Sequence, residues 1–137
     1  MFIRSSILCF FTLSIANVAY SGDRPNILII LADDLGYSDL GFQGGEIETP
    51  NIDRLADGGL TFTQFYNCAR CGPTRASIMT GLYSHQVGVY ELEPVEPGNN
   101  IFLSELLSKN GYATYMSGKW HLGNTPERLP HARGFDH

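Results

Sequence analysis

Hydrophobic residues fall into runs whose spacing predicts alternating strands and helices. Residues 26–32 (Asn-Ile-Leu-Ile-Ile-Leu-Ala) form a continuous apolar run, which is typical of a strand covered on both faces of a parallel sheet. Residues 60–66 are rich in threonine and aromatic side chains and predict a second strand, and residues 112–117 predict a third. The pattern therefore indicates an α/β fold with a parallel sheet.

Three other segments carry the spacing and end signals of helices. The first, 49–59, has Thr49 as its N-terminal cap, proline at its first helical position and glycine at its end. The second follows Pro73 and ends at Gly81, and the third spans 100–110. The hydrophobic residues of the first and third helices that are expected to face the core are Ile52, Leu55, Ala56, Phe102, Leu103, Leu106 and Leu107.

Residues 1–21 have the pattern of a secretory signal peptide. Arg4 precedes a largely apolar run over 7–19, and Ala-Tyr-Ser at 19–21 places small residues at the −3 and −1 positions before Gly22. The run is short for a membrane span of about 20 residues, which makes a membrane anchor the weaker reading. The sequence therefore predicts export to a periplasm or the extracellular space, or to a lysosome-type lumen in a eukaryote, with no membrane span after cleavage.

Composition narrows the classes of protein further. The 137 residues are 43% hydrophobic and 17% charged, which is typical of a globular domain rather than a disordered chain. A formal net charge of −5, without a cluster of basic residues, argues against a nucleic-acid-binding surface. The chain is long enough to bury the core of one small domain.

Two aspartates follow the first predicted strand directly. Asp33 and Asp34 stand at the carboxyl end of residues 26–32, where open α/β sheets place their ligands. Adjacent carboxylates are hard oxygen donors that suit Ca²⁺ or Mg²⁺ better than zinc. A bare pair of aspartates is also common in solvated turns, so these residues alone leave a turn and a metal site open.

The segment around the second helix holds a candidate nucleophile. Cys71 lies just ahead of the helix, where unpaired N–H groups and the helix dipole favour negative charge, and Arg75 adds a permanent cation one turn further. An exported chain could also pair Cys68 with Cys71 in a disulfide, or use the two thiols for redox chemistry. The redox reading is weaker, because the residues that follow Cys71 lack a thioredoxin-like context.

Three stretches of the chain resemble one enzyme family. Residues 71–75 (Cys-Gly-Pro-Thr-Arg) resemble the sulfatase signature, with Thr74 where many members carry serine. Residues 111–121, which end in Gly-Lys-Trp-His, resemble the second sulfatase signature, and residues 25–36 resemble the family's first strand with its two aspartates. The resemblance implies that residues 22–137 are the incomplete amino-terminal part of an alkaline-phosphatase-like sulfatase catalytic domain, a parallel-sheet sandwich.

The resemblance also implies a cofactor chemistry. In sulfatases, a formylglycine-generating enzyme oxidises the cysteine that corresponds to Cys71 to Cα-formylglycine, whose hydrate attacks the sulfur of a sulfate ester. Asp33, Asp34 and the modified Cys71 are then expected to bind Ca²⁺, with Mg²⁺ a weaker choice. The expected substrate is an aryl or carbohydrate sulfate ester.

Three further residues acquire expected roles in the same way. Lys119 is expected to hold the sulfate, His121 to hydrogen-bond the formylglycine hydroxyl, and Arg75 to offset charge. The residue types agree, because a lysine is a compact cation and a histidine two residues on in extended chain projects to the same side. Taken alone, a lysine and a histidine at this spacing would more often be a surface lysine and a packed histidine.

The length of the chain raises alternatives. Sulfatases are several times longer, so we expect a fragment that lacks the later metal ligands and is inactive by itself. A second hypothesis is a non-catalytic remnant that binds calcium or anions. A related phosphatase or phosphodiesterase is the alternative chemistry, although such an enzyme would place an unmodified serine or threonine at position 71.

Overall fold

The computed structural model describes residues 24–96, 98 and 100–137. The chain divides into two units, residues 1–31 and 32–137, and every described helix lies in the second. The predicted signal peptide, 1–21, lies outside the described residues. None of the helices in the described ranges is long and apolar enough to cross a membrane.

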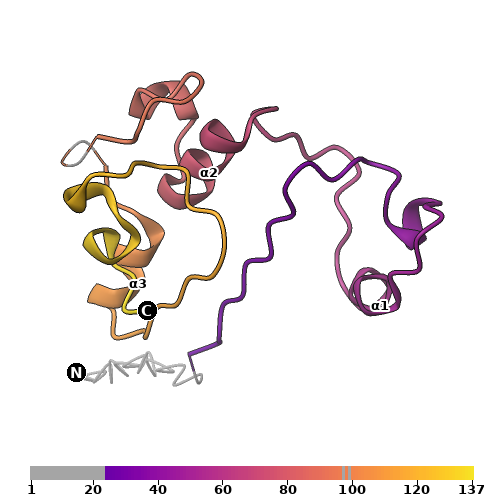
Figure 1. The fold of residues 1–137 in the computed structure, drawn as a ribbon. Helices are drawn as coiled ribbons and strands as arrows, with labels where there is room; N and C mark the ends of the chain where they lie inside the picture. Colours follow the sequence, from indigo (N-terminus) through magenta and orange to yellow (C-terminus); the bar gives the residue numbers. More distant parts are fainter. Residues whose placement is uncertain (1–23, 97, 99) are drawn as a thin grey trace, which may run out of the picture. The chain divides into compact units, whose positions relative to one another are not determined.

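The three predicted helices are confirmed (Figure 1). They are α1 (Pro50–Gly58), α2 (Cys71–Thr80) and α3 (Leu103–Lys109). Four short 3₁₀ helices connect them: η1 (Gly41–Gln43), η2 (Ser84–Val87), η3 (Pro126–Arg128) and η4 (Pro130–Arg133). α2 begins two residues earlier than predicted, so Cys71 is its first residue rather than the residue ahead of it. Gly81 ends α2 as predicted, with a left-handed φ of 68° and its N–H donating to the Ser77 carbonyl at 2.8 Å.

The predicted core face of α1 is wrong. Ile52 is 44% exposed and Leu55 is 67% exposed, and α1 has no buried residue. Thr49 stands at the N-cap position, but its hydroxyl instead accepts from the Gly41 N–H at 2.9 Å and donates to the Asp53 carboxylate at 2.6 Å. These bonds tie η1 to α1, whereas no layer of the described chain covers the apolar face of the helix.

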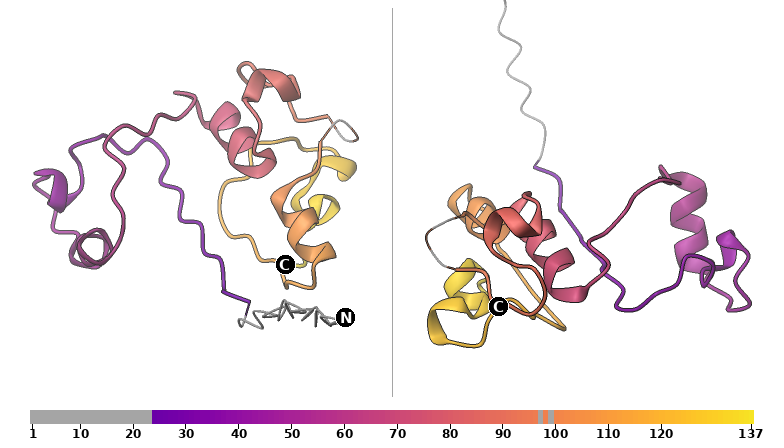
Figure 2. Two further views of the ribbon diagram at one scale, coloured as in Figure 1. Left: turned by 180° about the vertical axis from the view of Figure 1, so that it is seen from behind. Right: turned by 90° about the horizontal axis from the view of Figure 1, so that it is seen from above.

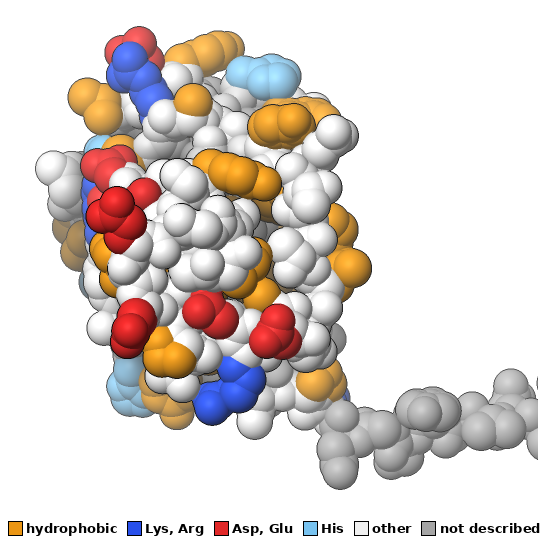
Figure 3. Space-filling model, turned by 90° about the vertical axis from the view of Figure 1, so that its right-hand side faces the viewer, with side chains coloured by type: hydrophobic (Ala, Val, Ile, Leu, Met, Phe, Trp, Pro, Cys, Tyr) orange, Lys and Arg blue, Asp and Glu red, His pale blue; other side chains and the backbone are white. Residues whose placement is uncertain are grey.

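The predicted strands do not form a sheet within the described part of the chain, which contains no assigned strand. The apolar side chains of 27–31 are between 40% and 83% exposed, and hydrophobic residues of 60–66 are also open to solvent. Figure 3 shows hydrophobic side chains exposed on one face of the molecule. A parallel strand takes its backbone hydrogen bonds from neighbouring strands, so these runs stay unpaired where the described residues supply no neighbour.

The third predicted strand is a partial exception. The Met116 N–H donates to the His137 carbonyl at 2.8 Å, and the His137 N–H donates to the Thr114 carbonyl at 3.3 Å. These two bonds flank Tyr115 in the pattern of a parallel strand pair. The Tyr115 and His137 rings also stack at 5.3 Å, so one step of parallel pairing is present at this segment.

The hydrophobic core lies around α2, η2 and α3. α2 packs against η2 and α3. The two views of Figure 2 show α3 beside the C-terminal segment. α3 begins three residues later than predicted, so Phe102 is its N-cap. Of the residues predicted to be buried there, Phe102 is 1% exposed but Leu106 is 47% exposed. The buried hydrophobic residues of the core are Ala76, Val87, Val89, Val95, Phe102 and Leu122, with Met79 and Trp120 packed against them.

A buried arginine fixes the C-terminal turn on α3. The Arg133 side chain is 5% exposed and lies 3.0 Å from the Glu105 carboxylate and 3.0 Å from the Asn100 amide oxygen. The Arg133 guanidinium carbon is 3.9 Å from the centre of the Phe102 ring. The Ser104 hydroxyl donates to the Arg133 backbone carbonyl. The charge is therefore paired where it is desolvated, as a buried cation requires.

We expect Gly134→Ala to destabilise the chain by more than about 1 kcal/mol. Gly134 has a φ of 87°, and a Cβ there would lie 2.5 Å from the Glu105 backbone nitrogen. Gly58→Ala is the matched control, since nothing lies within 4 Å of its Cβ position. Alanine within a helix stabilises by up to about 1 kcal/mol relative to glycine. Urea unfolding followed by circular dichroism compares the two variants, and equal midpoints would contradict the prediction.

Candidate active site

The candidate site draws on three segments that are distant in the sequence. Asp33 follows the first apolar run, Cys71 and Arg75 belong to α2, and Lys119 lies in the loop after residues 112–117. Cys71 and Arg75 are four residues apart, which places them on one face of α2. The structure therefore brings together four of the residues that the sequence singled out.

Asp33 joins the two cations. The Lys119 ammonium donates to Oδ2 of Asp33 at 2.8 Å, and an Arg75 guanidinium nitrogen lies 3.4 Å from Oδ1. The other terminal nitrogen of Arg75 donates to the Lys119 carbonyl at 2.5 Å. The Arg75 side chain is 12% exposed, against 41% for Asp33 and 44% for Lys119. Arg75 is thus the fixed member of the group, and the other two open to solvent.

Asp33 and Lys119 shift each other's pKa. The hydrogen bond from Lys119 is the main cause that holds the pKa of Asp33 below its usual value, and Arg75 adds to it. The same bond raises the pKa of Lys119, and the Cys71 thiol contributes in the same direction. The Cys71 thiol is therefore close enough to the Lys119 ammonium to stabilise its charge.

Cys71 occupies the N-terminus of α2. Arg70 is the N-cap, and its carbonyl accepts the first helical bond from the Thr74 N–H at 3.0 Å. The N–H groups of the first turn have no intrahelical acceptor, so they and the dipole favour an anion there. Cys71 and Cys68 are free thiols, and the Cys68 sulfur lies 3.4 Å from the Ser77 hydroxyl instead. The disulfide left open by the sequence is therefore absent.

His121 reaches the site through its backbone. A Cβ added at the buried Gly72 would lie 3.8 Å from the His121 carbonyl and 3.0 Å from the Glu91 carbonyl. Nδ1 of His121 is buried without a hydrogen-bond partner among the described residues. Sequence reasoning missed the close approach of the Glu91 and His121 carbonyls to Gly72, because this approach arises only when two loops pack against the start of α2.

Backbone strain gathers at the site. Three non-glycine residues in the described ranges have a left-handed φ: Asp34 at 57°, Ala69 at 58° and His121 at 58°. Each stands within two residues of Asp33, Cys71 or Lys119. Such conformations cost energy and persist where the surroundings fix them, often at functional sites. Aspartate and histidine adopt this conformation more often than most residues do, whereas Ala69 carries no signal of it in the sequence.

A calcium ion fits the chemistry of the two aspartates only in part. Asp33 and Asp34 offer hard carboxylate oxygens, and Asp34 forms no hydrogen bond or ion pair with the described residues. Ca²⁺ takes about six to eight oxygen ligands. No group of three histidine, cysteine, aspartate or glutamate side chains converges in the described part of the chain. Two carboxylates therefore offer too few oxygen atoms to hold a calcium ion by themselves.

Comparison with known proteins gives one consistent result. The family model described as Sulfatase matches residues 25–137. Arylsulfatase A from Bos taurus is 46% identical over 134 residues, which covers 90% of this chain and 26% of the bovine protein. An arylsulfatase from Klebsiella aerogenes is 37% identical over 129 residues, which covers 84% of this chain and 27% of that protein. The chain thus spans about a quarter of the length of these relatives.

Solved structures agree with the sequence matches. The crystal structure of Ps i-CgsB in complex with k-i-k-neocarrahexaose has a TM-score of 0.77 and 46% identity, over 83% of this chain and 27% of that one. The structure of PsFucS1 sulfatase from Pseudoalteromonas sp. has a TM-score of 0.74 and 38% identity, over 83% of this chain and 25% of that one. The matched family model and the second of these structures carry the same family description.

We expect Lys119→Met to raise the pKa of Asp33 towards its ordinary value of about 3.9, because the main group that favours the carboxylate is removed. Carbon-13 NMR of the Asp33 carboxyl measures this pKa. Lys109→Met is the control, since Lys109 is an exposed lysine in the last turn of α3. An unchanged pKa in Lys119→Met, or an equal rise in Lys109→Met, would contradict the prediction.

Proposed function

The chain belongs to the sulfatase family, and from this premise we propose that it forms part of an enzyme that hydrolyses sulfuric esters. Its predicted fold class, part of an alkaline-phosphatase-like sulfatase domain, is confirmed by the likeness to solved sulfatase structures. The observation that carries the proposal is the convergence of Lys119 and Arg75 beside Cys71 at the start of α2. Two cations and a helix N-terminus favour a tetrahedral oxyanion such as sulfate.

In this proposal, Lys119 holds the sulfate group and Arg75 offsets negative charge at the site. Lys119 is the more exposed of the two and contacts a sulfate oxygen, whereas Arg75 is largely buried and holds the Lys119 carbonyl in place. Fixed cations stabilise charge that develops in the transition state without having to reorganise. His121 lies next to the start of α2, and its imidazole is the candidate to hold or move a proton at the nucleophile.

The nucleophile is proposed to be formylglycine at position 71, formed by a formylglycine-generating enzyme. The hydrated aldehyde supplies two hydroxyl groups, one to attack sulfur and one to release the sulfate afterwards. A thiolate has no second hydroxyl and would not complete this release. Thr74, at the position where a serine is common, conserves a small hydroxyl residue and does not change this expectation.

A divalent cation is proposed as the second cofactor. Asp33, Asp34 and the modified residue 71 would hold Ca²⁺, with Mg²⁺ less suited because it prefers a small octahedral site. The ion would supply positive charge against the sulfate oxygens. Asp33 already lies between Lys119 and Arg75, so the metal, the sulfate and the two cations would meet at one place.

The proposed substrate is an aryl or carbohydrate sulfate ester. The proposed location is an exported one, periplasmic, extracellular or in a lysosome-type lumen, and it depends on the signal peptide predicted at residues 1–21. Related phosphatases are the alternative chemistry. They are disfavoured because Cys71 stands within a complete cysteine-x-proline-x-arginine pattern at residues 71–75.

We expect Cys71 to be converted to formylglycine when the chain is co-expressed with a formylglycine-generating enzyme. Mass spectrometry of the peptide that spans residues 71–75 measures the conversion. Cys68 is an internal control, because it is a free thiol outside the pattern and should remain cysteine. An unmodified Cys71, or equal modification of Cys68, would count against the sulfatase chemistry proposed for this chain.

The 137-residue chain by itself is expected not to turn over an aryl sulfate, even with formylglycine at position 71. The physical reason is that its described residues supply only part of a calcium ligand set. Release of 4-nitrophenol from 4-nitrophenyl sulfate measures the activity, with Cys71→Ala as the blank. Turnover clearly above that blank would refute this expectation and would place a working site within the chain.

A further inference from the structure

The loop of residues 118–123 carries Lys119 and His121, and one of its sides faces α2. Arg75 holds the Lys119 carbonyl, and the His121 carbonyl lies near the start of α2. These contacts fix the side of the loop that faces the candidate site. They do not fix its other side, which lies against η3 and the C-terminal turn.

Trp120 fixes that other side. It stands between Lys119 and His121, and its indole N–H donates to the Arg128 carbonyl at 2.9 Å. Its ring lies 5.8 Å from the Phe102 ring and 6.0 Å from the Phe135 ring, measured between centroids. The indole therefore couples the two functional side chains to the backbone of Arg128.

The Arg128 side chain also lies directly on the loop. A Cβ added at Gly123 would be 2.6 Å from Cβ and 2.8 Å from Cδ of Arg128, so the aliphatic stem covers the glycine backbone. Gly123 has a φ of 131°, which glycine adopts without strain. A displacement of Arg128 would therefore move two contacts with the loop: the Arg128 carbonyl with Trp120, and the Arg128 aliphatic stem with Gly123.

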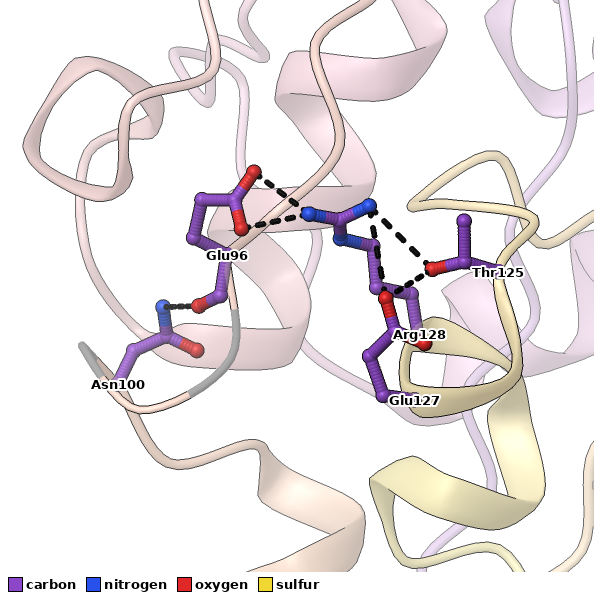
Figure 4. A network of polar contacts seen from close by, with 5 residues as sticks. All are labelled: Glu96, Asn100, Thr125, Glu127 and Arg128. Carbon is purple, nitrogen blue, oxygen red and sulfur yellow. Dashed lines mark hydrogen bonds and ion pairs between the residues drawn. The ribbon is translucent and has the colours of Figure 1, made fainter.

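The Arg128 guanidinium is held in turn by Glu96, a residue 32 positions away. One guanidinium nitrogen lies 2.8 Å from Oε1 and 2.6 Å from Oε2 of Glu96 (Figure 4). The other partners, Thr125 at 3.3 Å and Glu127 at 3.7 Å, belong to the same turn as Arg128. Of these contacts, only the one with Glu96 connects the turn to another part of the fold.

Glu96 connects this contact to the hydrophobic core. It follows Val95, which is 1% exposed in the hydrophobic core, and the Asn100 side-chain amide donates to its carbonyl at 3.4 Å. The Arg128 side chain is 21% exposed, so the pair is only partly screened by solvent. The chain of contacts thus runs from the core through Glu96 and Arg128 to the loop.

We propose that the Glu96–Arg128 ion pair is a positioning device that holds the loop of Lys119 and His121 in place for the sulfate site. Both residues are positioning residues, because neither contacts the candidate site itself. The expected effect of this ion pair on catalysis rests on the proposed function, whereas its expected effect on the position of the loop does not. An ion pair of this exposure changes a local equilibrium by up to about fivefold.

Trp120 is the single tryptophan of the chain, so its indole N–H is a specific probe of the loop. Hydrogen exchange of this N–H, followed by two-dimensional NMR on the full chain, is expected to be up to about fivefold faster in Glu96→Gln and in Arg128→Met. Glu127→Gln is the matched control, because it removes a carboxylate beside the same guanidinium but breaks no link to another segment. Its exchange rate should equal that of the unmodified sequence.

The charge-reversed double variant, Glu96→Arg with Arg128→Glu, should restore slow exchange if the ion pair is the cause. Glu96→Gln changes a side chain that is 57% exposed, so it tests the proposal even if Arg128→Met does not fold. Unchanged exchange in Glu96→Gln, or equally fast exchange in Glu127→Gln, would overturn the proposal.

Activity provides a separate measurement on the enzyme that contains this chain. We expect kcat for a sulfate ester to fall measurably, by up to about fivefold, in Glu96→Gln and to stay unchanged in Glu127→Gln, because loss of the ion pair shifts the position of the loop by no more than that. An enzyme without sulfatase activity in any variant would refute the proposed function but would leave the result from indole exchange intact. Faster indole exchange with an unchanged kcat would overturn the catalytic part of this inference.

Discussion

The candidate site depends on one carboxylate placed between two cations. Lys119 and Arg75 would repel each other if they approached without an anion, and Asp33 removes that repulsion by contacting both. The contacts span 42 positions to Arg75 and 86 positions to Lys119. A single side chain thus brings together three segments of the chain, and one of the two cations that it holds, Lys119, interacts with the Cys71 thiol.

This arrangement is suited to an anion that comes from outside the chain. A sulfate oxygen accepts hydrogen bonds from cations as a carboxylate oxygen does, which agrees with the sulfate site proposed beside Lys119 and Arg75. The N-terminus of α2 adds unpaired N–H groups at the same place. Family membership and this local electrostatic pattern support the same chemistry by independent routes.

The site is held at its periphery as well as at its centre. Left-handed backbone at Asp34, Ala69 and His121 stands next to the functional residues, and such conformations need firm surroundings. On the loop of residues 118–123, those surroundings are α2 on one side and the Trp120 contacts with Arg128 on the other. The core beneath α2 and α3 provides the rigid base for both.

Local signals in the sequence predicted the helices, and the motifs that resemble sulfatases predicted the fold class and the candidate residues. Helix ends depend on a few neighbouring residues, such as Gly81 after α2, and the functional residues stand in short motifs whose spacing is visible without a structure. The spacing of hydrophobic residues predicted less reliably which side chains are buried. Leu55 has the spacing of a core residue but is 67% exposed, because burial needs a partner surface that a periodic pattern cannot supply.

Long-range packing determines which of these residues come into contact. The sharing of Asp33 by Lys119 and Arg75, and the link from Glu96 through Arg128 to Trp120, join segments that are far apart along the chain. No local propensity encodes such pairings, since they follow from how loops and helices pack around a common core. Local chemistry therefore named the candidate residues, and long-range packing set their geometry.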